Sequence, residues 1–160
     1  MEYTIRPIKS SEIYLLKDFL YNAIFQKDES KPIPRSIIND PSIKVYIEDY
    51  GKTNDSCLVA ESEGKVVGCV WARILDGTVK GFGNIDSETP EFAISVLKDF
   101  RGLGIGSALM KEMLVLLKNH GFIKTSLAVQ KENYAVEMYK KVGFRILNET
   151  DEEYIMVCEL

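Results

Sequence analysis

The segment from Arg101 to Ser107 has glycine at every second position, between an apolar run and a stretch of helical periodicity. Glycine allows a sharp turn and lets a ligand approach the main chain without a Cβ atom in the way. The first N–H groups of a helix lack partners within the helix, and this end of the helix dipole is positive. Such a turn is suited to bind a diphosphate, with added charge from Arg101 and a hydroxyl from Ser107. A turn that uses glycine only for its shape is the alternative interpretation.

Two better-known phosphate motifs do not fit this segment. A P-loop needs Lys followed by Ser or Thr after its last glycine, and neither pair follows Gly106. The dinucleotide fingerprint G-x-G-x-x-G/A has Ser107 where its third glycine or alanine should stand. The pattern that does match is Arg-x-x-Gly-x-Gly.

A second segment that could do chemistry runs from Asn133 to Phe144. Asn133 is suited to cap the start of a helix, and Gly143 is suited to end it. Ala135 and Tyr139 are four residues apart and therefore share a helix face, where the small Ala135 leaves room for a ligand. Tyr139 is either a ligand contact or a tyrosine of an amphipathic core.

These two segments together resemble the recurring motifs of the GNAT N-acetyltransferase superfamily, over Glu91 to Met110 and Asn133 to Phe144. The resemblance implies the acyl-CoA N-acyltransferase fold and acetyl-CoA as the acyl donor. In the family, the loop amides bind the coenzyme A pyrophosphate, and the preceding strand binds the pantetheine arm like a further strand. Asn133 stands two residues before Ala135, where three is commoner, so capping alone also explains it. The implied cofactor-binding residues are Ile94, Ser95, Val96, Arg101, Gly102, Leu103, Gly104, Ile105, Gly106, Ser107 and Asn133.

The resemblance also implies catalytic roles. Tyr139 is expected to donate a hydrogen bond, and then a proton, to the departing coenzyme A thiolate. The Val96 amide is expected to polarise the thioester carbonyl. Glu91 is the expected general base at the start of the strand. Glu88 is a second candidate, water can relay either one, and a polar strand-end residue is the plain alternative for Glu91.

Acyl transfer to an amine requires a neutral amine, a polarised thioester and a stabilised leaving thiolate. We expect a primary amine to attack directly in a ternary complex, because the single histidine, His120, lies beside no cysteine that it could activate. The acceptor is expected to be a small-molecule or peptide amine, and the family resemblance implies that its site lies along Phe25 to Tyr50 and Asp76 to Ser87. A protein N-terminal or lysine acetyltransferase and a non-catalytic coenzyme-A-binding regulatory module are the alternatives.

Hydrophobic periodicity and turn residues predict the elements that position these groups. The hairpin implies antiparallel pairing in the first half, and the β-α-β units imply parallel pairing in the second. We expect an α/β fold whose mixed, mostly antiparallel central sheet has about six or seven strands with helices on both faces. The predicted strands are Tyr3 to Ile8, Asp55 to Ser62, Lys65 to Leu75, Glu91 to Leu97, Thr125 to Val129, Phe144 to Leu147 and Tyr154 to Cys158. The predicted helices are Glu12 to Phe25, a stretch broken at Pro41 that ends by Gly51, Ser107 to Asn119 and Asn133 to Val142.

Composition limits the remaining possibilities. A chain of 160 residues fits one domain, residues 1–160, and a net charge of −4 argues against nucleic-acid binding. One histidine and three separated cysteines indicate no metal site and reduced core thiols. Neither a leader sequence nor an apolar run of about 20 residues is evident, so we expect no membrane partner and a cytoplasmic location. A homodimer is compatible with the resemblance, since dimers are common in the family.

Overall fold

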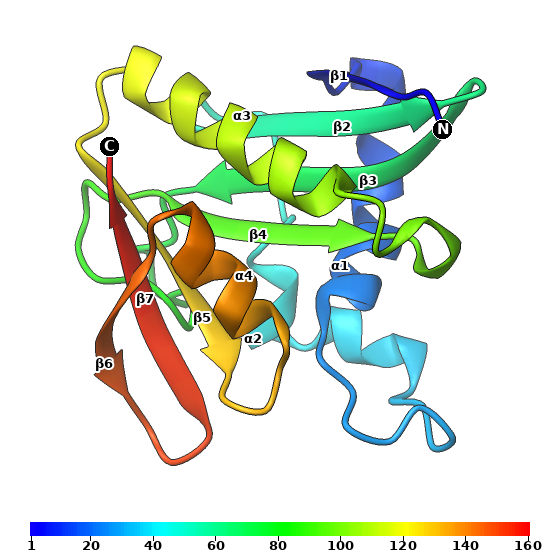
Figure 1. The fold of residues 1–160 in the computed structure, drawn as a ribbon. Helices are drawn as coiled ribbons and strands as arrows, with labels where there is room; N and C mark the ends of the chain where they lie inside the picture. The colour runs from blue at the N-terminus through cyan, green and yellow to red at the C-terminus, as the bar shows by residue number, and fades with distance from the viewer.

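The computed structural model describes residues 1–160. Seven strands form one sheet in the order β1-β2-β3-β4-β5-β7-β6 (Figure 1). The strands are β1 (Thr4–Pro7), β2 (Ser56–Ser62), β3 (Lys65–Arg73), β4 (Glu91–Val96), β5 (Lys124–Gln130), β6 (Arg145–Glu149) and β7 (Glu153–Glu159). The α-helices are α1 (Leu16–Ala23), α2 (Pro41–Lys44), α3 (Ile105–Asn119) and α4 (Ala135–Val142), and short 3-10 helices span Ser10–Leu15, Arg35–Asn39 and Lys98–Phe100.

All neighbouring strands pair antiparallel except β4 and β5, so the predicted fold class is confirmed. The expectation of parallel pairing throughout the second half is wrong, because β7 lies between β5 and β6. The two strands differ in how many side chains they bury. Met156 and Cys158 of β7 are buried, whereas every residue of β6 is exposed. The more apolar strand therefore takes the inner place and leaves β6 at the edge.

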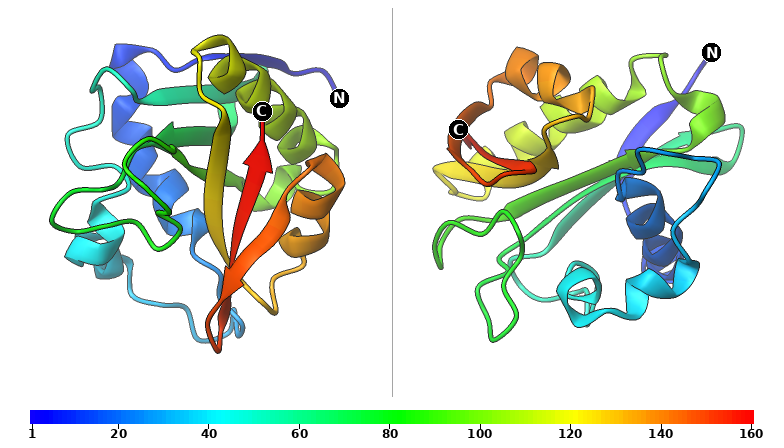
Figure 2. Two further views of the ribbon diagram at one scale, coloured as in Figure 1. Left: turned by 90° about the vertical axis from the view of Figure 1, so that its left-hand side faces the viewer. Right: turned by 90° about the horizontal axis from the view of Figure 1, so that it is seen from below.

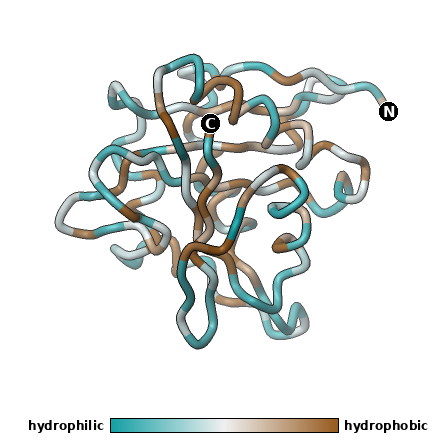
Figure 3. The backbone as a smooth tube through the Cα atoms, turned by 60° about the vertical axis from the view of Figure 1, so that its left-hand side comes forward, coloured by the Kyte–Doolittle hydropathy of each residue, from teal (hydrophilic) through white to brown (hydrophobic).

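The helices cover both faces of the sheet. Helices α3 and α4 lie on one face, and α1 and α2 lie on the other (Figure 2). The α3 side holds the larger core, in which Leu109, Met113 and Leu117 pack against β2 to β5. Phe19 of α1 and Trp71 of β3 belong to the smaller core on the opposite face. Apolar segments accordingly run through the strands, and polar segments lie in the outer loops (Figure 3).

Several predicted boundaries shift by a few residues. The first helical stretch begins as a 3-10 helix, and only Leu16–Ala23 is α-helical. The predicted break at Pro41 is confirmed, since the Asp40 side chain accepts a hydrogen bond from the Ser42 amide and caps α2. Helix α3 begins at Ile105, directly after Gly104 in a left-handed conformation with φ 85°. None of the helices combines the length and the apolar character that crossing a membrane requires.

Candidate active site

Strands β4 and β5 pair at one position only, Glu91 with Ser126, and then diverge (Figure 1). Antiparallel strands direct the main-chain groups of alternate residues to opposite sides. The Leu97 amide donates a hydrogen bond to the Val67 carbonyl of β3, so the main-chain groups of Leu97 and Ser95 face β3. The main-chain groups of Ile94 and Val96 therefore face the gap between β4 and β5. The middle of the sheet therefore contains an unpaired strand edge.

The glycine-rich turn lies at the end of this edge. From Gly102 to Ser107, no backbone amide finds an acceptor in the chain, and Ala108 is the first to bond, to the Gly104 carbonyl at 3.1 Å. Gly102 and Gly104 adopt positive φ angles of 76° and 85°, which a side chain would strain. The turn thus leaves a series of N–H donors without partners, as an anion site requires.

Two cationic side chains stand beside the turn. Arg101 Nε donates to the Val96 carbonyl at 2.9 Å, which fixes the guanidinium over the end of β4. Lys98 Nζ lies 3.4 Å from Glu29 Oε2. Leu103 differs from its neighbours in the turn, because its side chain is 53% exposed to solvent.

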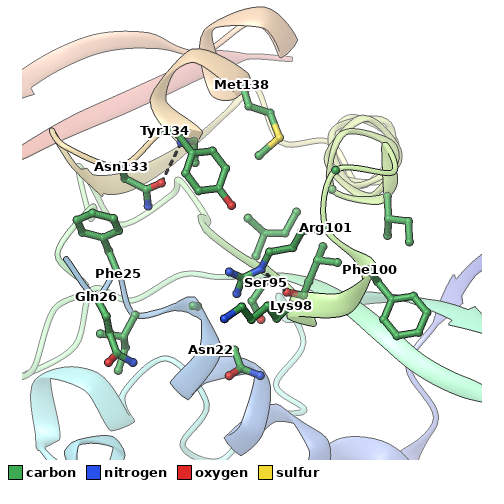
Figure 4. A pocket seen from close by; sticks show the side chains of 18 of the residues that line it. Asn22, Phe25, Gln26, Ser95, Lys98, Phe100, Arg101, Asn133, Tyr134 and Met138 are labelled. Atoms are coloured by element: carbon green, nitrogen blue, oxygen red, sulfur yellow. Dashed lines mark hydrogen bonds between the residues drawn. The ribbon is translucent and has the colours of Figure 1, made fainter. Parts of the chain in front are cut away.

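A cavity of about 710 Å³ connects the turn with the opened strand edge. This volume lies within the range of small-molecule sites, about 300–1,000 Å³. Its walls come from the end of α1 and the segment after it, from β4, from the turn and from the start of α4. Side chains that surround this space include Phe25, Gln26, Lys98, Arg101, Tyr134 and Met138 (Figure 4).

Most of the predicted site residues line this one cavity. They are Ile94, Ser95, Val96, Arg101, Gly102, Gly104, Ile105, Gly106, Ser107, Asn133 and Tyr139. Ser95 lines it, although its hydroxyl donates to the Phe19 carbonyl at 2.8 Å and so ties α1 to β4. Glu91 and Leu103 are the predicted residues outside the lining.

Helix α4 contributes Tyr139 and its surroundings. Asn133 Oδ1 accepts a hydrogen bond from the amide of Ala135, the first residue of α4, at 2.9 Å, although Tyr134 and not Asn133 takes the N-cap position. Gly143 ends the helix at φ 117°. The Tyr139 ring packs edge-on against Phe144, while its hydroxyl has no hydrogen-bond partner within the chain. Burial raises the pKa of Tyr139, so the hydroxyl keeps its proton at neutral pH.

Glu91 opens β4 on the face toward α2, and it is only 3% exposed. Its Oε2 accepts hydrogen bonds from the Tyr46 hydroxyl and from the Gly83 amide, the latter at 3.1 Å. Its Oε1 is buried without a partner. Burial raises the pKa of Glu91 to about 7, against the lowering effect of the two donors. The other predicted candidate, Glu88, is exposed.

The residues that hold Glu91 could not be identified from the sequence alone. Tyr46 lies 45 residues away in the chain, and no local pattern connects the two. Arg73 and Asp55 form an ion pair 3.0 Å long beside them, with side chains 4% and 5% exposed. The one signal in the sequence was Arg73 itself, a charged residue inside the apolar β3 segment. Because buried charges in proteins are paired, it indicated a partner of opposite charge.

The family model described as "Acetyltransferase (GNAT) family" matches residues 21–144. The N-alpha-acetyltransferase of Sulfolobus acidocaldarius is 33% identical over 104 residues, which are 62% of this chain and 60% of that protein. The protein of the same name from Sulfurisphaera tokodaii is 31% identical over 104 residues, 62% of each chain. The matched region thus spans less than two thirds of these relatives' length.

Solved structures share the fold. The PaiA N-acetyltransferase from Thermoplasma acidophilum, in complex with coenzyme A, superimposes with a TM-score of 0.70 at 16% identity over 100% of both chains. The ribosomal-protein-S18-alanine N-acetyltransferase from Escherichia coli gives 0.67 at 16% identity, over 99% of this chain and 94% of that one. The family match covers both motifs and the helix and strand between them. The chain therefore belongs to the acetyltransferase (GNAT) family.

Proposed function

We propose that the chain is an acetyl-CoA-dependent N-acetyltransferase that acetylates a primary amine by direct attack in a ternary complex. One observation carries the proposal: the free amides of Gly102 to Ser107 and the unpaired edge of β4 border a single cavity. A ligand with a diphosphate at one end and an extended amide chain at the other matches both parts. Membership of the family supports the same assignment.

The turn would hold the pyrophosphate of acetyl-CoA. Its free amides and the positive end of α3 favour a bound anion, and Arg101 adds a full charge. Gly106 has no side chain to cover its main chain, and a Cβ atom there would be in ordinary contact with Val96 and Met138, at 3.8 Å from each. A phosphate can therefore approach the main chain at this position.

The edge of β4 would hold the pantetheine arm as an additional strand does. The arm leads away from the turn, so it passes Val96 first and Ile94 next, about 7 Å further along the strand. The reactive end of acetyl-CoA is the end remote from its phosphates. We therefore assign the Ile94 amide to the thioester carbonyl, in place of the Val96 amide that the family resemblance implied.

Tyr139 is proposed as the proton donor to the leaving thiolate. Tyr139 lines the cavity, and its hydroxyl holds its proton at neutral pH and has no hydrogen-bond partner within the chain. During transfer, the amine nitrogen forms a bond to the carbonyl carbon and the carbon–sulfur bond breaks. The thiolate then takes the Tyr139 proton, and the new amide loses its extra proton to a base.

Glu91 is proposed as that base, with water relaying the proton, because the carboxyl does not line the cavity itself. A base acts best when its pKa lies near the working pH, and burial brings the pKa of Glu91 to about 7. Glu88 is exposed and lacks this environment. The oxygen without a partner, Oε1, is the atom that has acceptor capacity left.

The acceptor is proposed to be a primary amine, either of a small molecule or of a peptide. The two relatives named N-alpha-acetyltransferase favour the amino group of a peptide as the second candidate. Tyr21, Phe25 and Gln26 border the cavity from the side of α1 and offer contacts to either kind of acceptor.

Calorimetry with acetyl-CoA tests the donor, and thiol release with a panel of amines and N-terminal peptides tests the acceptor. We expect binding of acetyl-CoA and turnover of at least one acceptor class. Absence of binding contradicts the proposal as a whole. Binding without turnover of any amine indicates a non-catalytic coenzyme-A-binding module instead.

A further inference from the structure

Tyr46 follows α2, and its hydroxyl bonds Glu91, the first residue of β4. We infer that Tyr46 is a positioning residue for the reaction: it orients the Glu91 carboxyl so that Oε1, and not Oε2, receives the proton released by the amine. The inference rests on the proposed function, in which Glu91 is the base. Tyr46 itself lines no part of the cavity and acts through Glu91 alone.

The direction of the hydrogen bonds follows from the partners of the Tyr46 hydroxyl. The Phe82 amide donates to this oxygen at 2.9 Å. A hydroxyl carries a single hydrogen, and the amide already occupies a lone pair, so the hydrogen points at Glu91. Tyr46 is therefore the donor and Glu91 Oε2 the acceptor.

The two carboxyl oxygens consequently differ. Oε2 accepts from both Tyr46 and the Gly83 amide, and a proton placed on it would oppose these donors. Oε1 is buried and has no partner, so it has free acceptor capacity. Gly81 lies against Oε1, where a Cβ atom would collide with it, so in this conformation the loop covers the oxygen and a relay water reaches it only when the loop moves.

Tyr46 is itself held from several sides. Its carbonyl accepts a hydrogen bond from Trp71 Nε1 at 3.0 Å, and its ring stacks on Phe82 with centroids 6.4 Å apart. The preceding carbonyl, of Val45, accepts from Arg73 Nη1 at 3.0 Å. A side chain fixed in this way can define the orientation of its partner.

No unpaired cation faces Glu91 from the surrounding elements. From β3, Arg73 is its neighbour across the strands, but it is bound to Asp55. From β7, Glu153 adds negative charge that raises the pKa of Glu91 further. Burial is the largest influence and also raises it, whereas Tyr46 and the Gly83 amide lower it. Loss of the Tyr46 donor should therefore raise this pKa.

The test is the substitution Tyr46→Phe, read by carbon-13 NMR titration of Glu91 in the protein without substrate, with Glu91→Gln identifying its signal. A hydrogen bond to a charged group contributes enough to predict a rise of about one to two pH units. The acidic limb of the pH profile of kcat should move to higher pH by the same amount, while the KM for acetyl-CoA stays unchanged. Tyr50→Phe is the matched control, because its hydroxyl makes no contact with Glu91 and its ring lies by Arg73.

If Tyr46→Phe does not fold, incorporation of 3-fluorotyrosine at position 46 provides a second test. The fluorinated phenol is a stronger donor of the same shape, so the Glu91 titration should shift to lower pH. An unchanged titration in both variants, or an equal shift in Tyr50→Phe, would overturn the inference. The titration needs no acceptor, so it separates this result from a failure of the proposed function, which appears as absent turnover in the wild type.

Discussion

Arg73 and Glu91 lie directly opposite each other on β3 and β4, yet the Arg73 guanidinium binds Asp55 and not Glu91. The buried cation is thereby neutralised by a different carboxylate. Glu91 is left in the interior with two neutral donors on one oxygen and none on the other. The two acids therefore differ: Asp55 is paired with a cation, whereas Glu91 keeps one oxygen without a partner.

Glu91 should make the stability of the protein fall as pH rises. Its pKa is about 7 when folded and near 4.5 when unfolded, so the folded state retains a proton between these values. The stabilisation is complete below the unfolded pKa and disappears as pH passes the folded one. Relative to Glu91→Gln, the wild type should lose about 3 kcal/mol of unfolding free energy between roughly pH 4 and pH 8. Urea denaturation at several pH values measures this difference, and Glu88→Gln should run parallel to the wild type.

The Asp55–Arg73 pair should contribute strongly to stability. Asp55→Asn removes a charge but little volume, and it leaves the guanidinium buried without compensation. We expect a loss of about 3 kcal/mol or more in denaturant unfolding. The control is Asp18→Asn, at an ion pair with Arg35 that is more than half exposed, where about 0.5 kcal/mol or less is expected. Equal effects at the two sites would contradict this interpretation of the buried pair.

Gly106→Val should weaken the binding of acetyl-CoA. The side chain would occupy the space beside Val96 and Met138 that the turn leaves open, without a positive φ to strain it. Overpacking costs about 1–3 kcal/mol, which corresponds to roughly tenfold to hundredfold weaker binding by calorimetry. Gly77→Val, in open space on a distant loop, is the control and should bind as the wild type does. Undiminished affinity in Gly106→Val would exclude the turn as the pyrophosphate site.

Tyr139→Phe should reduce kcat by about a hundredfold, since general acids contribute that much or more. The affinity for acetyl-CoA and the melting temperature should hardly change, because the hydroxyl has no partner within the chain. Tyr154→Phe provides the comparison, as this tyrosine packs against the same core cluster. A variant as active as the wild type would remove Tyr139 from the mechanism and strengthen the case for a binding module.

Local signals in the sequence were sufficient for much of the site. Three features of the site each depend on a few adjacent residues. They are the glycines with positive φ in the turn, the hydrogen bond from Ala135 to Asn133 at the start of α4, and the end of that helix at Gly143. The hairpin turn at Glu63 and Gly64 is of the same kind, and both residues adopt positive φ. Such features are predictable because the backbone conformation excludes most other residues.

The surroundings of Glu91 were not predictable in this way. Tyr46, Arg73 and Asp55 meet only after α2, β2 and β3 have packed together, and no periodicity links their positions. The place of β7 inside the sheet has a similar origin, since it depends on which of two strands buries more apolar surface. Long-range pairing of this type is a property of the assembled fold.

The divergence of β4 and β5 also decides where the sheet leaves a strand edge unpaired. Unpaired strand edges at the rim of a sheet can recruit strands from other molecules, a first step in aggregation. Here the unpaired edge lies within the sheet, with the segment after α1 and the start of α4 on either side of it. The molecule can therefore keep main-chain groups ready for a ligand without offering them to a neighbouring chain.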